Sequence, residues 1–325
     1  MSSDIQKQQA ENKRDICLDM IRAIAIVSVV FIHCYEQFYY IDNSEAYLFG
    51  RMGVPLFLML SAATMIGREY KSIGSFYARK VLSLYGVSVF WLFLYGIGQT
   101  DPLNNLVNAL GLVSSAKHLW YFSILIVLYL ALPFLSYLNS QSIRDVMILG
   151  IITLCISMFQ LFGFIWLGNQ YMYVFVYLIW GYLCYRRKLH EKVPFLVWLA
   201  LLAVALFAFH FLINNPWCKQ QFTDHNADIW WYSSPLVLIP SLFLFPALLH
   251  FKVKGHIFTI LSRCSFGIFV VHLYIIDLID DFVLRLPLEN GTVITLILWA
   301  AAFTLSFAAS FLLGKIPFLR KLVLQ

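Results

Sequence analysis

Apolar runs of about twenty residues recur along the whole chain, and no other feature of the sequence constrains the fold as strongly. An α-helix needs about 20 mostly apolar residues to cross the ~30 Å hydrocarbon layer of a bilayer. Only 12% of the 325 residues are charged, whereas soluble domains carry about 25%. Too little polar surface remains to cover a water-facing exterior, so the sequence predicts an all-α integral membrane protein.

The runs predict a bundle of about ten transmembrane helices with both termini in the cytoplasm. A cytoplasmic tail at 1–17 is expected to precede the membrane domain at 18–314, and a second tail at 315–325 to follow it. The expected spans are 18–40, 48–67, 77–98, 118–138, 146–167, 169–187, 194–213, 233–250, 262–281 and 292–314. Two long outer segments, 99–117 and 214–232, are expected to do more than connect helices.

The basic residues favour ten spans over nine. With the N-terminus inside, eighteen of the 23 Lys and Arg residues fall in cytoplasmic segments and three in outer ones. Merging the fifth and sixth spans would move the later basic clusters outside, against the positive-inside rule. Because the basic residues are spread over short loops, the net charge of +6 does not indicate a nucleic-acid partner. The six cysteines lack a CxxC pair and Cys/His ligand spacing, so no metal is expected.

The first helix carries the densest set of ionisable side chains. Arg22 and His33 are eleven residues apart, which puts them on one helix face about 16 Å apart along the axis. Glu36 follows one turn after His33 and can orient the imidazole. Histidine suits proton transfer from a hydroxyl near neutral pH, which predicts that His33 is a base and that Arg22 binds an anion. The alternatives are a structural histidine and a snorkelling arginine paired with Asp19.

Other polar and aromatic side chains are weaker candidates for substrate binding. They are Arg51, His118, Trp120, His272, Asp228 and Trp231. An interfacial aromatic belt explains the tryptophans equally well, and a structural hydrogen bond explains His272 equally well. The inner basic cluster of Arg68, Lys71, Arg79 and Lys80 is first a topogenic signal, and it could also bind phosphates.

Several stretches, in order along the chain, resemble the acyltransferase family 3 membrane proteins. The opening of the first span, with its later histidine, resembles that family's "LDxLRgiA…H" pattern, and the second span resembles "GVplFFxlSG", with Ala62 where glycine is usual. The stretches are Leu18–Ala25 with His33, Arg51–Ala62, Lys117–Phe122, Tyr129 with Pro133, and Ser265–His272. Within the family, the length and the segment Ala227–Tyr232 are most similar to the enzymes that O-acetylate enterobacterial common antigen.

The resemblance implies an O-acetyltransferase of the bacterial inner membrane. Acetyl-CoA would be the acyl donor, and the acceptor would be a hydroxyl of a saccharide or glycolipid. Arg22 and His33 match the family's essential arginine and histidine, and Arg68, Arg79 and Lys80 match its CoA-side basic residues by position. The acceptor sugar, acetyl against longer or succinyl donors, direct transfer against an acyl-histidine intermediate, and the oligomeric state all stay open.

Two other classes of protein are compatible with buried ionisable residues. A secondary transporter would use the buried His, Arg and Glu as a proton or substrate relay, although the internal repeats and broken helices that many transporters carry are not evident here. A scaffolding membrane protein without chemistry would tolerate substitution of Arg22 and His33 as it tolerates ordinary packing changes.

Overall fold

The computed structural model describes residues 15–37, 44–68, 72–99, 101–113, 116, 118–161, 172–218, 220, 230–285 and 291–323. Within these ranges the chain forms helices and no β-strand, as the hydropathy pattern predicts. Every expected span overlaps a helix. Five described helical segments are long and apolar enough to cross a membrane. They are Ile16–Glu36, Glu45–Met65, Trp120–Ser140, Phe195–Asn214 and Gly291–Leu313.

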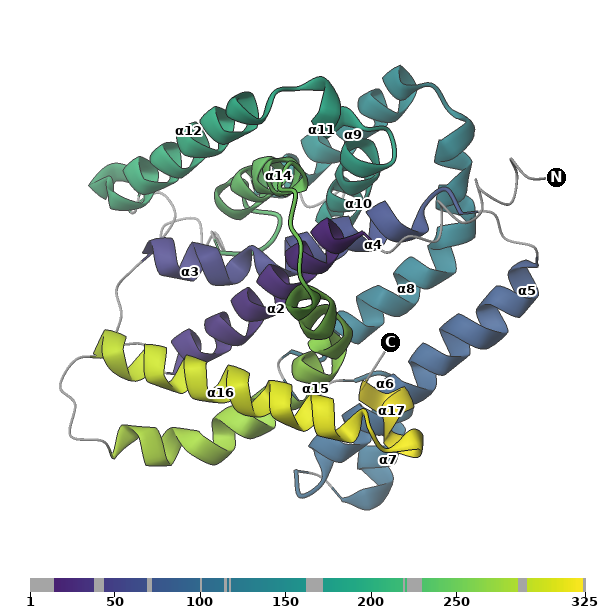
Figure 1. The fold of residues 1–325 in the computed structure, drawn as a ribbon, viewed down its shortest axis with the longest axis vertical. Helices are drawn as coiled ribbons and strands as arrows, with labels where there is room; N and C mark the ends of the chain where they lie inside the picture. The colour runs from purple at the N-terminus through teal and green to yellow at the C-terminus, as the bar shows by residue number, and fades with distance from the viewer. Residues whose placement is uncertain are drawn as a thin grey trace.

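The first helix, α2 (Ile16–Gln37), runs through the middle of the molecule (Figure 1). It packs against α4 (Gly53–Met65) on one side and against α15 (His256–Leu284) on the other. Helix α16 (Gly291–Leu313) packs against both α15 and α2. Because α2 is enclosed by other helices, its polar side chains face protein and internal space rather than lipid.

The second expected span is one apolar stretch in sequence but two helices in the structure. Helix α3 (Ser44–Arg51) leads into α4, and the chain turns at Met52, just before Gly53. A Cβ at Gly53 would lie 2.7 Å from the carbonyl oxygen of Ala25, so only glycine allows this close approach of α4 to α2.

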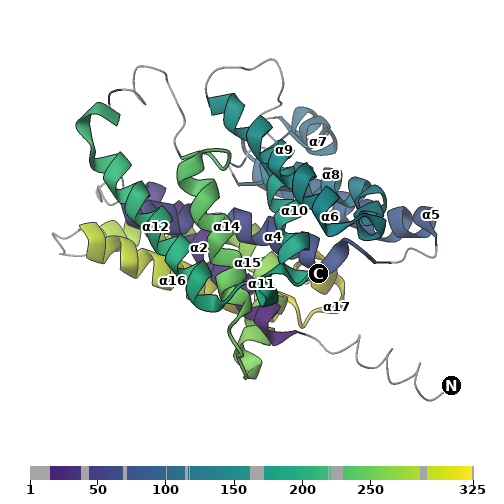
Figure 2. The same cartoon turned by 90° about the horizontal axis from the view of Figure 1, so that it is seen from above.

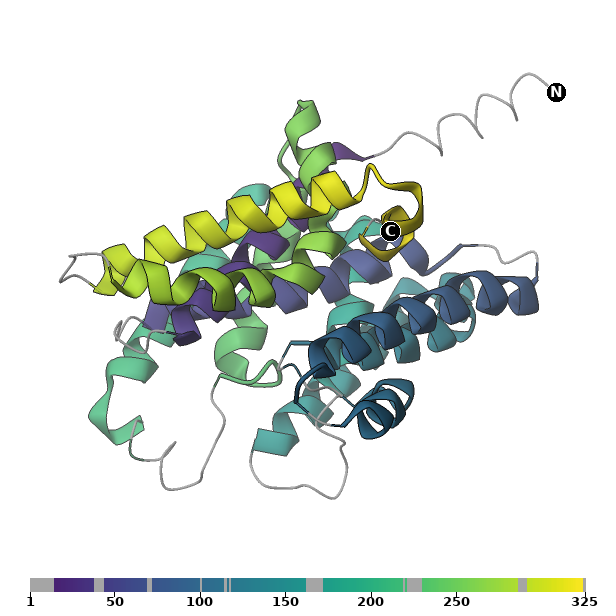
Figure 3. The same cartoon turned by 90° about the horizontal axis from the view of Figure 1, so that it is seen from below.

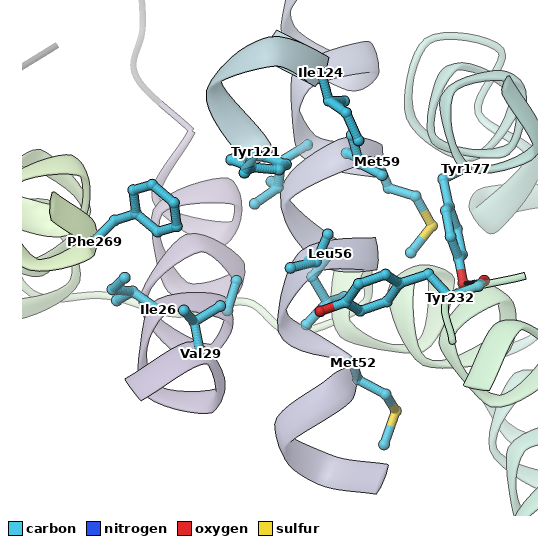
Figure 4. Close-up of a cluster of buried hydrophobic side chains, with 14 of the residues drawn as sticks. Ile26, Val29, Met52, Leu56, Met59, Tyr121, Ile124, Tyr177, Tyr232 and Phe269 are labelled. Atoms are coloured by element: carbon cyan, nitrogen blue, oxygen red, sulfur yellow. Dashed lines mark hydrogen bonds between the residues drawn. The ribbon is translucent and has the colours of Figure 1, made fainter. Parts of the chain in front are cut away.

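Helices α10 (Tyr173–Tyr185) and α14 (Pro235–Leu249) flank the α2–α4 pair. Both are apolar but shorter than the five long spans. A Cβ at Gly181 of α10 would lie 2.3 Å from the carbonyl oxygen of Met59, which shows how closely α10 and α4 approach. Figure 4 shows Met59 and Tyr177 of this packed interior.

The remaining helices surround this central group, as two further views show (Figures 2 and 3). They are α5 (Ile73–Phe76), η1 (Tyr77–Val81), α6 (Leu82–Gly96), α7 (Pro102–Leu110), α8 (Trp120–Leu135), η2 (Ser136–Ser140), α9 (Ile143–Leu161), α11 (Leu189–Lys192), α12 (Phe195–Asn214) and α17 (Pro317–Val323). Large apolar side chains of α12 are exposed, among them Leu196, Phe207 and Phe211. Such a surface is suited to lipid contact.

The boundary between the fifth and sixth expected spans, 162–171, lies outside the described residues, so the count of ten helices stays a prediction, as does the orientation of the termini. The segment 99–117, which is expected on the outer side, contains α7, which packs on α6. Asp101 caps α7 by accepting hydrogen bonds from the N–H groups of Leu103 and Asn104, and buried Asn105 donates to the carbonyl of Phe93 at 2.9 Å. This amphipathic helix is suited to a position at the membrane interface.

Candidate active site

Three imidazoles from distant parts of the chain meet in the interior. His33 lies on α2, His118 lies just before α8, and His272 lies on α15. The ring centroid of His33 is 5.1 Å from that of His272 and 6.1 Å from that of His118. The His118 and His272 rings are 4.9 Å apart. We call these three residues the histidine cluster.

The two histidines that α2 does not carry are fully enclosed. His118 is 2% exposed and His272 is 0% exposed. Nδ1 of His272 donates to the carbonyl of Phe269 at 2.7 Å, which leaves Nε2 as the nitrogen with a free lone pair. In the described part of the chain, neither Nε2 of His272 nor either ring nitrogen of His118 has a hydrogen-bond partner. Buried polar atoms without partners are uncommon and indicate a place for water or a ligand.

A carboxylate anchors His33. Nδ1 of His33 is 3.5 Å from Oε2 of Glu36. The other oxygen, Oε1, accepts hydrogen bonds from Arg51 at 2.9 Å and from the Tyr47 hydroxyl at 3.0 Å, and Arg51 also donates to Tyr47. With Nδ1 turned to the carboxylate, Nε2 of His33 is the nitrogen that can accept a proton or attack a carbonyl.

An aromatic group adjoins Arg51. We call Tyr47, Trp120, Trp231 and Tyr232 the aromatic group. The guanidinium of Arg51 lies over the rings of Tyr47 and Tyr232. Trp120 and Trp231 pack on each other at 5.8 Å between ring centroids, and Trp120 is 5.7 Å from Tyr232. Within the described residues, the Nε atoms of Arg51 and Trp231 are buried without a hydrogen-bond partner. The structure thus brings together Arg51, Trp120 and Trp231, whereas Asp228 lies outside the described residues.

A cavity of about 510 Å³ opens beside the N-terminal half of α2, where Arg22 lies. Four basic side chains, several hydroxyl groups and a set of apolar side chains line it. The polar ones are Arg22, Ser61, Thr64, Arg79, Lys80, Ser83, Ser262, Ser265 and Lys321. None of the described lining residues is Asp or Glu. We call this space the cationic cavity.

Local structure positions the cations of the cavity. Nη1 of Arg22 donates to Oγ of Ser262 at 2.9 Å and lies 3.8 Å from Asp19, so α15 orients the arginine. Arg79 and Lys80 belong to the π-helix η1, and π-helices are rare and frequent at functional sites. Arg68 is described but does not line the cavity, and Lys71 lies outside the described residues.

Phe269 lies next to both the cavity and the histidine cluster. Phe269 and Tyr121 both line the cavity, and their rings point toward one another (Figure 4) at 5.7 Å between centroids. The Phe269 ring is also 5.3 Å from His118 and 6.1 Å from His272. His33 is not among the residues that line the cavity, whereas Phe269 lines the cavity and contacts the two enclosed histidines.

Several functional candidates were missed from the sequence. They are Tyr47, Phe269, Ser262 and Lys321. Their segments are apolar or terminal and carry no distinctive pattern, and only the packing of helices brings these side chains to the site. A weak signal existed for Phe269, which lies inside the Ser265–His272 stretch. In the described part of the chain, no group of three or more His, Cys, Asp or Glu side chains is arranged to hold a metal ion.

Comparison with known protein families identifies the family to which the chain belongs. The family model described as Acyltransferase domain (Acyl_transf_3) matches residues 15–315. No curated protein and no solved structure matches the chain. The matched range includes α2, the histidine cluster and every cavity residue named above except Lys321. Because the model covers nearly the whole chain, the protein belongs to this acyltransferase family and is a membrane acyltransferase.

Proposed function

We propose that the protein is an O-acetyltransferase of the bacterial inner membrane that moves an acetyl group from acetyl-CoA to a hydroxyl of a cell-envelope saccharide. One observation carries the proposal. Arg22 lines the cationic cavity, while His33, on the same helix, belongs to the histidine cluster beyond Phe269. An anionic donor bound in the cavity would have its reactive end directed along α2 toward a base.

The cavity has the chemistry that a CoA thioester requires. Four cations without a lining carboxylate among the described residues suit a ligand with three phosphate groups, because charge-assisted hydrogen bonds to phosphate are strong. The apolar lining, including Phe57, Leu125 and Phe266, suits the less polar pantetheine arm. The thioester would reach His33 when the Phe269 side chain rotates away from Tyr121.

Two routes for the transfer fit the same residues. In direct transfer, Nε2 of His33 takes the proton of the acceptor hydroxyl while the hydroxyl oxygen attacks the thioester carbonyl. The carbon–sulfur bond then breaks, and the CoA thiolate receives the proton from the imidazolium. In the covalent route, Nε2 attacks the carbonyl first, and the carbon–sulfur bond breaks to release CoA as a thiolate. The saccharide hydroxyl then attacks the acetyl-histidine, the released Nε2 takes the hydroxyl proton, and the imidazolium passes that proton to the thiolate.

The aromatic group is suited to the acceptor. Trp120 and Trp231 offer rings on which a sugar can stack, and the unpartnered Nε atoms of Arg51 and Trp231 can donate to its oxygens. The acceptor would then approach His33 from the side of Glu36 and Arg51. The resemblance of the chain length and of the sequence Ala227–Tyr232 to enzymes acting on enterobacterial common antigen makes that glycan, or a lipid-linked form of it, the first acceptor to test.

The test uses the purified protein in liposomes with acetyl-CoA and extracts of envelope glycans, with mass spectrometry of the acetylated product. We expect acetylation by the wild-type protein, and its loss in His33→Ala with acetyl-CoA binding retained. His210→Ala is the matched control, because His210 is exposed and pairs with Glu45 outside the histidine cluster. Full acetyl transfer by His33→Ala would refute the catalytic role.

Binding of the donor is tested separately by thermal stability. A ligand at 100 times its Kd stabilises the folded state by about 2.7 kcal/mol, so saturating acetyl-CoA should raise the melting temperature of the protein and of His33→Ala alike. Absence of that rise would contradict the donor assignment. Solute or proton flux without any acetylation would instead favour the transporter alternative, since the pair of Glu36 and His33 can also pass protons.

A further inference from the structure

The last described helix, α17, is packed onto the membrane domain rather than extended from it. Val323 is 1% exposed, and Nε1 of Trp91 on α6 donates to the carbonyl of Leu322 at 3.0 Å. Helix α17 also contacts α15 and α16. In Figure 1 it lies beside α6, close to the C-terminus.

A glycine on α15 makes room for this packing. A Cβ at Gly267 would lie 2.1 Å from Oγ of Ser310 and 2.9 Å from the carbonyl oxygen of Val323. The hydroxyl of Ser310 donates to the carbonyl of Cys264 at 3.0 Å. The end of α17 therefore lies against the backbone of α15, next to the segment that carries Ser262, Ser265 and the cavity wall.

This packing brings Lys321 into the cationic cavity, where it joins Arg22, Arg79 and Lys80. The four cations come from three elements: α2, η1 and α17. The neighbouring Arg320 belongs to the same short helix but is not among the lining residues. A basic side chain brought to this cavity by the chain terminus adds positive charge where none of the described lining residues is acidic.

We propose that Lys321 binds a phosphate group of the acyl-CoA nucleotide and that α17 is a wall of the donor site. The inference rests on the proposed function, because it assigns one more contact to the same donor. The ammonium group of lysine suits this role as a compact charge with three rotatable donors. The chain terminus would thus take part in donor recognition, although its sequence reads as a cytoplasmic tail.

The test measures KM and kcat for Lys321→Gln with acetyl-CoA, acetyl-3′-dephospho-CoA and S-acetylpantetheine, which lacks the nucleotide. We expect KM for acetyl-CoA to rise about tenfold, which corresponds to about 1.4 kcal/mol, with kcat within about twofold of wild type. With S-acetylpantetheine, Lys321→Gln and wild type should behave alike. If acetyl-3′-dephospho-CoA also removes the difference between the two proteins, the contacted group is the 3′-phosphate; if the difference persists, it is the pyrophosphate.

Two further variants separate charge from structure. Lys321→Arg keeps the charge and should keep KM within about threefold, whereas Arg320→Gln removes a charge from the same helix outside the cavity and should leave KM unchanged. Trp91→Phe removes the hydrogen bond to Leu322 while keeping an aromatic ring. It should raise KM for acetyl-CoA in the same direction as Lys321→Gln, because α17 is held less firmly.

Several outcomes would overturn the inference. An unchanged KM for acetyl-CoA in Lys321→Gln would show that the side chain does not contact the donor. If Lys321→Gln loses the same factor in kcat/KM with all three donors, the result would indicate that Lys321 has a structural role or binds a lipid phosphate. If the wild-type protein acetylates from acetyl-CoA and Lys321→Gln does too with the same KM, only this inference falls. If the wild-type protein neither binds nor uses acetyl-CoA, both the proposed function and the inference fall.

Discussion

Glu36→Gln gives the sharpest test of how His33 is activated. The carboxylate accepts hydrogen bonds from Arg51 and Tyr47 through Oε1 and faces Nδ1 of His33 with Oε2 at 3.5 Å. Glutamine keeps an oxygen for Arg51 and Tyr47, which leaves its NH₂ group to face the imidazole. An NH₂ group at this position requires Nδ1 to accept a hydrogen bond, so the ring proton moves to Nε2. The proposed chemistry needs Nε2 without a proton, because its lone pair acts as base or nucleophile.

The size of the effect follows from the lost interaction. A hydrogen bond to a charged group contributes about 1.5–3 kcal/mol, and each 1.36 kcal/mol of barrier is about tenfold in rate. Because 3.5 Å is long for a charge-assisted hydrogen bond, which is typically about 2.8 Å, we expect the lower part of that range. Glu36→Gln should therefore lower kcat about ten- to thirtyfold and leave KM for acetyl-CoA unchanged, since Glu36 does not line the cationic cavity.

The assay is steady-state acetyl transfer in liposomes, with the release of CoA thiol as the signal. Glu45→Gln is the matched control, because it makes the same chemical change in another Glu–His pair, where Oε1 of Glu45 lies 2.5 Å from Nδ1 of His210 and both side chains are more than half exposed. This control should stay within about twofold of wild type. A Glu36→Gln variant that folds normally and keeps wild-type kcat would refute the proposed orientation of His33.

Three further substitutions follow from the packing. Phe269→Ala should raise the rate of acetyl-CoA hydrolysis without acceptor, because removing the ring joins the cationic cavity to the histidine cluster and admits water; unchanged hydrolysis, measured as thiol release, would show that Phe269 is no barrier. Gly181→Ala should lower the melting temperature in detergent, because the new Cβ would lie 2.3 Å from the carbonyl oxygen of Met59 and overpacking costs about 1–3 kcal/mol. The control is Gly86→Ala, whose new Cβ would have no neighbouring atom within 4 Å and which should melt no lower than wild type. Lys80→Gln should raise KM for acetyl-CoA and weaken its dependence on salt, because part of the screened attraction is removed; an unchanged salt dependence in the same kinetic assay would place Lys80 outside the donor site.

The membrane character and the shared face of Arg22 and His33 were readable from the sequence, because both depend on local properties. Hydropathy over about 20 residues decides whether a segment enters a bilayer. The period of 3.6 residues decides which side chains of one helix align. The same period puts Glu36 within reach of His33, and the structure has that pair at 3.5 Å.

What tertiary structure alone decided is which helices meet. In the sequence, His118 and His272 are two separate weak candidates. In the structure, helix packing brings their rings to 4.9 Å from each other beside His33. The sequence predicts that Lys321 is part of a tail. In the structure, α17 packs on α15, and this packing brings Lys321 to the cationic cavity. Hydropathy and periodicity describe one segment at a time, whereas contacts between segments depend on close approaches such as that of Gly267 to Val323, which no local pattern encodes.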